Sequence, residues 1–82
     1  MLELLYFGKL GDVTGKTSEQ IELPPSVPDL NSLRQWIDER FEADGIFLEP
    51  TVRIAVDNEI KSNDFKISNA REIAFLPPVG GG

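Results

Sequence analysis

The sequence predicts an α+β roll, in which a mixed sheet of four to five strands carries one main helix on one face. Two observations lead to this fold class. Apolar residues recur at helical spacing in only one stretch, residues 29–41, whereas four or five short segments elsewhere alternate or are continuously apolar. The chain has 82 residues, 40% of them apolar, which is enough for one small core. We therefore expect one domain over residues 1–78 and a flexible tail over residues 79–82.

The first segment, residues 2–7, is predicted to be a strand that is apolar on both faces. Leu4 and Tyr6 share one face. Leu5 and Phe7 share the other. A strand of this kind is expected at the centre of a sheet, or with its second face covered by a partner.

The next segment is predicted to be a turn region followed by a second strand. Three glycines punctuate residues 8–16, which we interpret as a hairpin connection. Residues 17–23 alternate between apolar and polar side chains and end at Pro24-Pro25, as expected of a strand.

The one clear helix is predicted to begin at Pro28-Asp29, with Asp29 as its N-cap. Gly45 is a natural stop for it. At about 100° per residue, its apolar side chains fall on one face, with Trp36 on the flank: Leu30, Leu33, Ile37 and Phe41. We interpret Trp36 and Phe41 as core packing rather than as a ligand-stacking site.

The second half of the chain predicts three more strands after residues 46–50, which have no readable pattern. Residues 51–56 alternate, the turn signal Asp57-Asn58 follows, and residues 59–61 form a brief return strand. Residues 72–76 are the last strand, stopped by Pro77-Pro78.

With the helix between the second and third strands, the first and last strands can pair in parallel at the sheet centre. Alternation along the last strand assigns Ile73 and Phe75 to the helix face. Ala74 and Leu76 are assigned to the open face.

Composition excludes several classes of function. The net charge of −6 makes the chain a poor candidate for binding nucleic acid or an anionic membrane, and it suits a basic protein surface instead. The chain has no Cys and no His, so it lacks thiolates, the commonest metal ligand and the usual neutral-pH general base. We expect no bound metal and no catalysis by the chain's own side chains. The start of the chain has no basic leader and no apolar run of membrane-spanning length, so we expect a cytoplasmic protein.

Two chemical motifs are considered and set aside. Residues 11–17 (GDVTGKT) resemble a phosphate-binding loop, but only three residues separate the glycines where that motif has four. The segment that follows also alternates like a strand, whereas the motif needs a helix there. The 14 carboxylates form no calcium-binding loop. The sequence leaves paired carboxylates for acid–base work open, although a solvated acidic surface is the favoured interpretation.

The glycine-rich end of the chain is the strongest chemical signal. Gly80, Gly81 and Gly82 have no Cβ atoms and can thread a narrow channel, and Val79 and Pro78 precede them as a stiffer stem. The α-carboxylate of Gly82 is ionised at neutral pH. It can attack the α-phosphorus of ATP to give an acyl-adenylate, which a sulfur or amine nucleophile can then take. A frayed, inert end is the alternative.

Both ends of the chain resemble the MoaD family, the small sulfur-carrier subunits of molybdopterin synthase, which have the ubiquitin-like β-grasp fold. The resemblance rests on residues 4–10 (LLYFGKL), residues 54–59 (IAVDNE) and residues 73–82 (IAFLPPVGGG). The last of these is the most specific, because a double glycine alone is shared by every ubiquitin-like carrier. In length and element order, the resemblance covers essentially the whole chain.

The resemblance implies a cycle of activation and sulfur transfer. An E1-like, MoeB-like adenylyltransferase that uses ATP would adenylate the carboxylate of Gly82, and a sulfur donor would convert it to a thiocarboxylate. The tail would then enter a large, MoaE-like catalytic subunit in a heterotetrameric synthase, where the sulfur builds the dithiolene of molybdopterin. This chain would be a non-catalytic carrier with no bound cofactor. By position, Phe7, Ile60 and Leu76 would form the apolar patch that docks its partners.

Two departures from the family pattern are visible. Residues 69–72 (NARE) stand where the family has Gly-Asp-Glu before the last strand, so the turn there is expected to differ. Gly80 stands where the family has Thr, Ser or Ala, which loosens the tail. Three alternatives stay open: a carrier for thiamine synthesis or tRNA thiolation, a modifier that is conjugated to lysines, and an interaction module with an inert tail.

Overall fold

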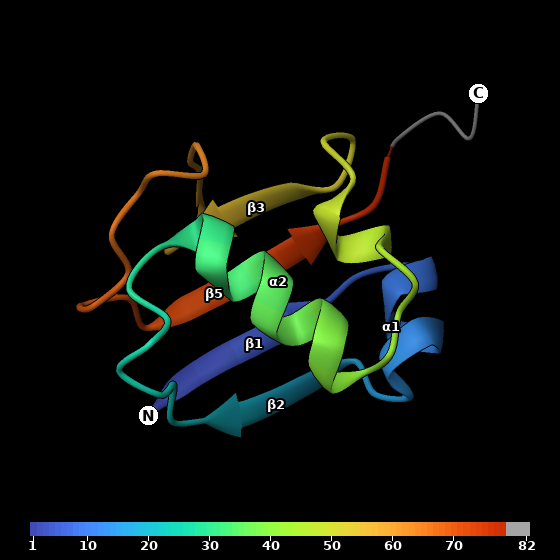
Figure 1. Cartoon of the computed structure of the whole chain (residues 1–82), viewed down its shortest axis with the longest axis horizontal. Coiled ribbons are helices and arrows are strands. Elements are labelled where there is room, and N and C mark those ends of the chain that lie inside the picture. Colours follow the sequence, from blue (N-terminus) through green and yellow to red (C-terminus); the bar gives the residue numbers. More distant parts are fainter. Residues whose placement is uncertain (79–82) are drawn as a thin grey trace.

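The computed structural model describes residues 1–78 and confirms the predicted α+β roll. A five-stranded sheet has the order β2-β1-β5-β3-β4, and α2 lies across one face of it (Figure 1). In chain order the elements are β1 (Leu2–Tyr6), α1 (Lys9–Thr14), β2 (Ser18–Ile21), α2 (Leu30–Arg40), the 3₁₀ turn η1 (Ile46–Leu48), β3 (Arg53–Val56), β4 (Glu59–Ile60) and β5 (Glu72–Leu76). None of the helices in the described part of the chain has the length and apolarity to cross a membrane.

The two central strands, β1 and β5, run parallel, as predicted. Leu4 pairs with Ile73 and Tyr6 pairs with Phe75, whereas β1 with β2, β3 with β5, and β3 with β4 are antiparallel. Because β1 and β5 run the same way, their carboxyl ends lie together at one edge of the sheet.

The N-terminus of α2 is closed by reciprocal hydrogen bonds, which confirms Asp29 as its N-cap. Asp29 Oδ1 accepts from the backbone N–H of Ser32 at 2.9 Å, and Ser32 Oγ accepts from the N–H of Asp29 at 3.3 Å. Leu30, Leu33 and Ile37 are fully buried under the helix. The helix ends at Arg40, not at Gly45, because the chain turns through Glu42 and Asp44 with positive φ.

The core is built around stacked aromatic rings. Tyr6 and Phe75 stack with their ring centroids 5.6 Å apart, and Phe47 meets Phe75 edge-on at 5.3 Å. Phe47 belongs to η1, in the connection that had no readable pattern, yet it is completely buried. Ile73 and Phe75 are also fully buried, so the predicted helix face of β5 is confirmed.

The structure corrects the interpretation of residues 8–16, which contain the six-residue helix α1 rather than a plain hairpin connection. Gly8 and Gly15 have positive φ at its two ends. The second strand is also shorter than predicted, because only Ser18–Ile21 pair with β1. In the turn before β5, neither Asn69 nor Ala70 has a positive φ.

Candidate functional site

The stem of the tail, Pro77-Pro78, begins at the end of the sheet where the carboxyl ends of β1 and β5 lie. β5 lies at the centre of the sheet and leads directly into Pro77 and Pro78, the last described residues. Proline fixes φ near −65°, so this stem is stiff. The predicted tail residues Val79, Gly80, Gly81 and Gly82 lie outside the described residues.

The sheet face opposite α2 carries a continuous apolar row across four strands. Register places Leu5 beside Ala74, Ala74 beside Ala55, and Ala55 beside Ile60. Ile60 is 48% exposed at the end of this row. No described helix lies on this side of the sheet, so the row is open to a partner.

Two further predicted residues lie next to this row, toward the tail. Phe7 and Leu76 follow the Tyr6–Phe75 pair on the parallel strands, and Phe7 N–H donates to the carbonyl of Phe75 at 3.1 Å. Phe7 is 46% exposed and Leu76 is half-buried. The structure therefore brings Phe7 and Leu76 together. Ile60 lies on β4, two strands from Leu76 and three from Phe7, and is joined to them through Ala55 and Ala74. We call this surface the apolar face: Leu5, Phe7, Ala55, Ile60, Ala74 and Leu76.

Charges flank the apolar face at its two ends. At the start of β5, Glu3 and Glu72 are direct cross-strand partners, both half-buried. At its finish, the exposed Arg53 pairs in register with Leu76. Like charges placed opposite each other on a sheet are destabilising, so the acidic pair is a feature that a basic partner group would relieve.

The connection beside the stem is held by a buried arginine. Arg34 of α2 is 7% exposed and donates to the carbonyls of Phe47, Glu49 and Val52 and to Asn63 Oδ1, at 2.7–3.2 Å. Burial lowers the pKa of Arg34 below its ordinary value. These bonds hold the connection between α2 and β3, from which Glu49, Thr51 and Val52 line a small hollow. Lys9 and Pro78 line the same hollow.

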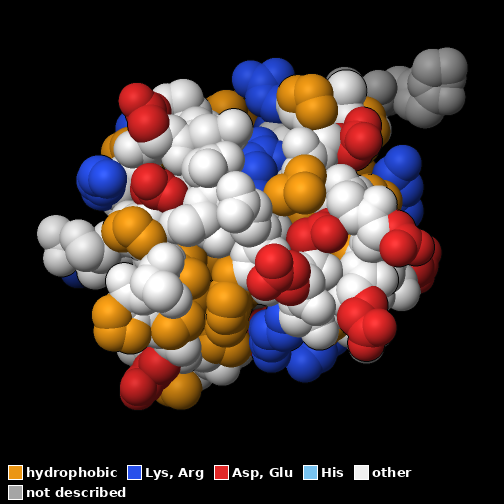
Figure 2. All heavy atoms as spheres, in the orientation of Figure 1, with side chains coloured by type: hydrophobic (Ala, Val, Ile, Leu, Met, Phe, Trp, Pro, Cys, Tyr) orange, Lys and Arg blue, Asp and Glu red, His pale blue; other side chains and the backbone are white. Residues whose placement is uncertain are grey.

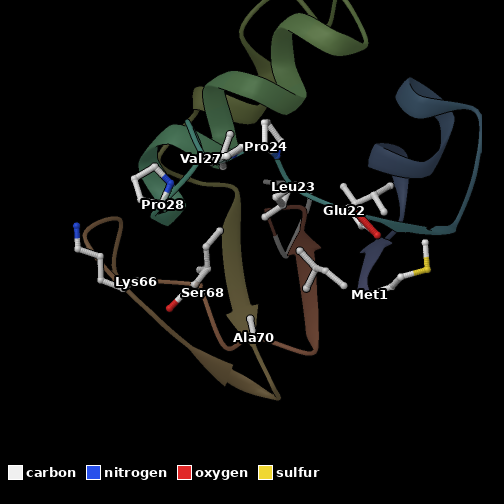
Figure 3. A pocket seen from close by; sticks show the side chains of 13 residues that line it. Met1, Glu22, Leu23, Pro24, Val27, Pro28, Lys66, Ser68 and Ala70 are labelled. Atoms are coloured by element: carbon white, nitrogen blue, oxygen red, sulfur yellow. The ribbon is translucent and has the colours of Figure 1, made fainter.

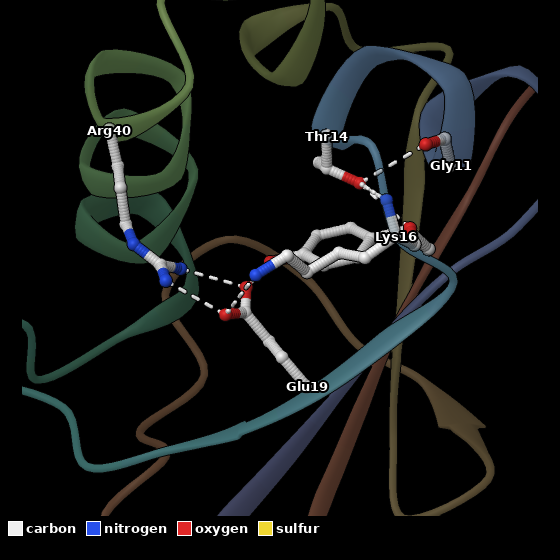
Figure 4. Close-up of polar contacts among 6 residues, drawn as sticks. Gly11, Thr14, Lys16, Glu19 and Arg40 are labelled. Atoms are coloured by element: carbon white, nitrogen blue, oxygen red, sulfur yellow. Dashed lines mark hydrogen bonds and ion pairs between the residues drawn. The ribbon is translucent and has the colours of Figure 1, made fainter.

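The carboxylate of Glu19 has a strongly lowered pKa, and its contacts stabilise the fold. Glu19 accepts two hydrogen bonds from Arg40 at 2.8 Å and one from the Tyr6 hydroxyl at 2.6 Å, and Lys16 approaches it at 3.5 Å (Figure 4). The hydrogen bond from Arg40, more than any other cause, lowers the pKa of Glu19 to about 2. Burial and then the bond to Glu19 raise the pKa of Tyr6. A carboxylate held ionised in this way ties β2 to the end of α2 and does not exchange protons near neutral pH.

A larger hollow, of about 680 Å³, lies at the other end of the sheet from the stem (Figure 3). Its lining is mostly apolar, with Glu22 and Lys66 among the residues around it. Hydrophobic side chains gather on this side of the molecule in the view of the helix face (Figure 2). The hollow contains none of the predicted site residues.

The sequence motifs set aside earlier do not form sites. Gly11 lies within α1 and Thr17 precedes β2, so the segment 11–17 lacks the following helix that a phosphate-binding loop requires. In the region 1–78, no group of three or more Asp or Glu side chains is placed to hold a metal ion.

Comparison with protein families shows which family the chain belongs to. The model that matches residues 4–82 is that of the ThiS family. The chain belongs to the ThiS family. It is 32% identical to the molybdopterin synthase sulfur carrier subunit of Caenorhabditis briggsae, over 99% of this chain and 96% of that protein. It is 28% identical to the protein of the same name from Escherichia coli K12, over the full length of both.

Solved structures show that this ThiS-family chain has the ubiquitin-like β-grasp fold. A putative molybdopterin converting factor subunit 1 from Pyrococcus furiosus superposes with a TM-score of 0.76 at 26% identity, over 95% of this chain and 97% of the other. Small archaeal modifier protein 1 from Haloferax volcanii superposes with a TM-score of 0.78 at 16% identity, over 99% and 98% of the two chains, and shows the fold alone. The resemblance to the MoaD family is confirmed.

Sequence reasoning named only Phe7, Ile60 and Leu76 as the docking patch of the ThiS-family chain. Ala74, predicted on the open face of the last strand, and Leu5, predicted on the face of Phe7, belong to the same surface. Ala55 joins them through its pairing with Ala74, and the alternation of its strand was the signal that could have placed it there. Arg34 carried no such signal, because a charged residue in an amphipathic helix normally faces water.

Proposed function

We propose that this chain is the sulfur carrier subunit of a molybdopterin synthase and that the carried sulfur is bound at Gly82. The observation that carries the proposal is the end-to-end similarity to curated proteins of that name, which includes the Pro-Pro stem and the glycine end. The geometry supports it, because the stem leaves the sheet centre beside an open apolar face.

The chemistry takes place at the carboxylate of Gly82. A carboxylate oxygen attacks the α-phosphorus of ATP, pyrophosphate leaves, and an acyl-adenylate forms. A hydrosulfide ion released by the sulfur donor then attacks the acyl carbon, and AMP leaves with the electron pair of the broken C–O bond. The product is a thiocarboxylate. After its sulfur has been given to the pterin precursor, water supplies the oxygen that restores the carboxylate.

The proposal assigns the catalytic side chains to two partners. An E1-like adenylyltransferase would bind ATP, and a large synthase subunit would receive the tail and bind the pterin precursor. Phe7, Leu76 and Ile60 would contact these partners through the apolar face. Our proposal retains the cytoplasmic location expected from the sequence.

The tail is tested by changing its length. Deleting Gly82, or adding one residue after it, should abolish ATP–pyrophosphate exchange by the adenylating enzyme while leaving the melting temperature within about 2 °C, because terminal glycines bury almost nothing. The control adds one residue before Met1 and should leave exchange unchanged. A chain without Gly82 that still supports molybdopterin formation would contradict the carrier role.

The second candidate is a β-grasp carrier for another acceptor or a protein modifier, favoured by the superposition on small archaeal modifier protein 1. The acceptor decides between them. Thiocarboxylated protein incubated with a large synthase subunit and the pterin precursor should yield a dithiolene product. Sulfur delivery to a thiamine precursor or tRNA alone, or an isopeptide bond to lysine, would favour the second candidate.

A further inference from the structure

Gly8 lies against Pro77 at the point where the two central strands part. After the hydrogen bond from Phe7 N–H to the Phe75 carbonyl, β1 turns into α1 and β5 continues into the stem. A Cβ atom placed on Gly8 would lie 3.0 Å from Cγ of Pro77, closer than a side chain normally approaches. The proline ring therefore rests directly on the glycine backbone.

The backbone of Gly8 is fixed in a conformation that other residues rarely adopt. Its φ is 55° and its ψ is −134°, a region open mainly to glycine. Leu10 N–H donates to the Phe7 carbonyl at 3.1 Å, and Gly11 N–H donates to the Gly8 carbonyl at 3.0 Å. Leu10 is completely buried, so α1 is anchored to the core. Pro77 therefore packs against a backbone segment whose conformation is fixed.

Pro78, the second proline of the stem, lies near a different part of the chain from Pro77. Pro78 lines the small hollow that Lys9 shares with the connection between α2 and β3. That connection is held by the buried Arg34, and Asp38 accepts hydrogen bonds from the N–H groups of Gly45 and Phe47 at 2.9 and 3.0 Å. Pro77 therefore lies against Gly8, and Pro78 lines the same hollow as a connection that is held by hydrogen bonds.

We propose that Gly8 is a positioning residue for the carried group. This inference rests on the proposed function of the tail. Because Gly8 has no Cβ, Pro77 seats against it, and this contact sets the direction in which the stem Pro77-Pro78 leaves the sheet. Proline transmits that direction, since its φ is locked. A reacting group has to be placed to within about 1 Å, and such a misplacement can slow a reaction by about 10²-fold.

The test compares two glycines at the ends of the same helix. Gly15 also has a positive φ, of 79°, but a Cβ on it would meet nothing within 4 Å. Gly15→Ala therefore introduces backbone strain without touching the stem, and it is the matched control for Gly8→Ala.

Each variant is assayed with the adenylating enzyme, for affinity by calorimetry and for kcat of ATP–pyrophosphate exchange at saturating carrier. Gly8→Ala should lower kcat on the order of tenfold with affinity within about twofold, because the apolar face is unchanged. Gly15→Ala should leave both within about twofold.

A folded Gly8→Ala protein with wild-type kcat, or one that loses only affinity, would overturn the inference. If Gly8→Ala does not fold, Pro77→Ala removes the ring from the other side of the contact, and an unchanged kcat for that variant would overturn the inference as well. Absence of exchange with the wild-type chain would instead count against the proposed function.

Discussion

The guanidinium of Arg34 lies 2.7 Å from the carbonyl oxygen of Val52, 18 residues away in the chain. Within residues 1–78, no carboxylate forms a salt bridge with Arg34. The buried charge is satisfied by backbone carbonyls and one amide, so it ties α2 to the segment that contains the buried Phe47.

Arg34→Met should lower the free energy of unfolding by about 3 kcal/mol, because the substitution leaves buried carbonyls of Phe47 and Val52 without donors. Urea denaturation measures the change. Arg71→Met, at an exposed position, is the control and should shift stability by about 0.5 kcal/mol or less. If Arg34→Met is no less stable than that control, the carbonyl contacts contribute nothing measurable.

Because of Glu19, the free energy of unfolding should decrease as the pH falls through the acid range. Its pKa is lowered to about 2 in the folded chain from an ordinary value of 4.5. The stabilisation is therefore fully present above pH 4.5 and is lost as the pH falls toward 2. Glu19→Gln should cost about 2 kcal/mol at pH 7, reduced from the full pKa difference because Arg40 is partly exposed.

The measurement is the difference in unfolding free energy between wild type and Glu19→Gln from pH 7 down to pH 2. It should shrink through that acid range. Glu39→Gln, at an exposed position of α2, is the control and should change the free energy of unfolding by about 0.5 kcal/mol or less at pH 7. If the difference in unfolding free energy between wild type and Glu19→Gln stays constant down to pH 2, the ion pair between Glu19 and Arg40 is not formed.

The two faces of β5 should respond oppositely to substitution. Phe75 is fully buried, so Phe75→Ala should destabilise the fold by about 3–5 kcal/mol. Leu76→Glu and Phe7→Glu should leave the monomer folded but weaken binding to the large subunit by at least about tenfold, because they bury an unpaired charge.

Thermal melting and calorimetric titration, run side by side, separate these effects. Leu48→Glu changes a side chain that is 49% exposed outside the apolar face, and it should alter neither quantity strongly. Binding that survives Leu76→Glu would show that partners dock elsewhere.

Association with the proposed adenylating enzyme should be faster at low salt, because a chain with a net charge of −6 suits a basic partner surface. Stopped-flow on-rates measured against ionic strength test this. Neutralising Glu3 and Glu72 together should reduce the salt dependence more than neutralising Asp12 and Glu39, which removes the same charge from the two helices. Equal effects from both pairs would mean that only net charge matters.

Much of the fold was predictable because local and long-range signals agreed. Asp29 caps α2 as its sequence indicates, and the two-sided apolar pattern of residues 2–7 matches their central position. α1 was not predicted, because Gly8, Gly11 and Gly15 disfavour a helix in isolation, and tertiary anchoring by Leu10 outweighs that preference. The burial of Phe47 could not be predicted for a related reason. Its carbonyl accepts a hydrogen bond from Arg34 and its N–H donates to Asp38, and both partners lie on α2, 13 and 9 residues earlier in the chain.

The predicted site was only partly accessible from the sequence. Alternation placed Phe7 and Leu76 on one face, but their adjacency depends on parallel register, which no local pattern encodes. The contact between Gly8 and Pro77 joins residues 69 positions apart, since 77 − 8 = 69, and only the folded chain brings them together.

The parallel course of β1 and β5 has a practical consequence for handling the protein. Met1 lies next to the start of β1, a full strand length from the edge where Pro77 and Pro78 emerge. An affinity tag, a fluorophore or a surface linker attached at Met1 would therefore leave the stem unobstructed, and immobilised protein would present Pro77 and Pro78 to a partner in solution.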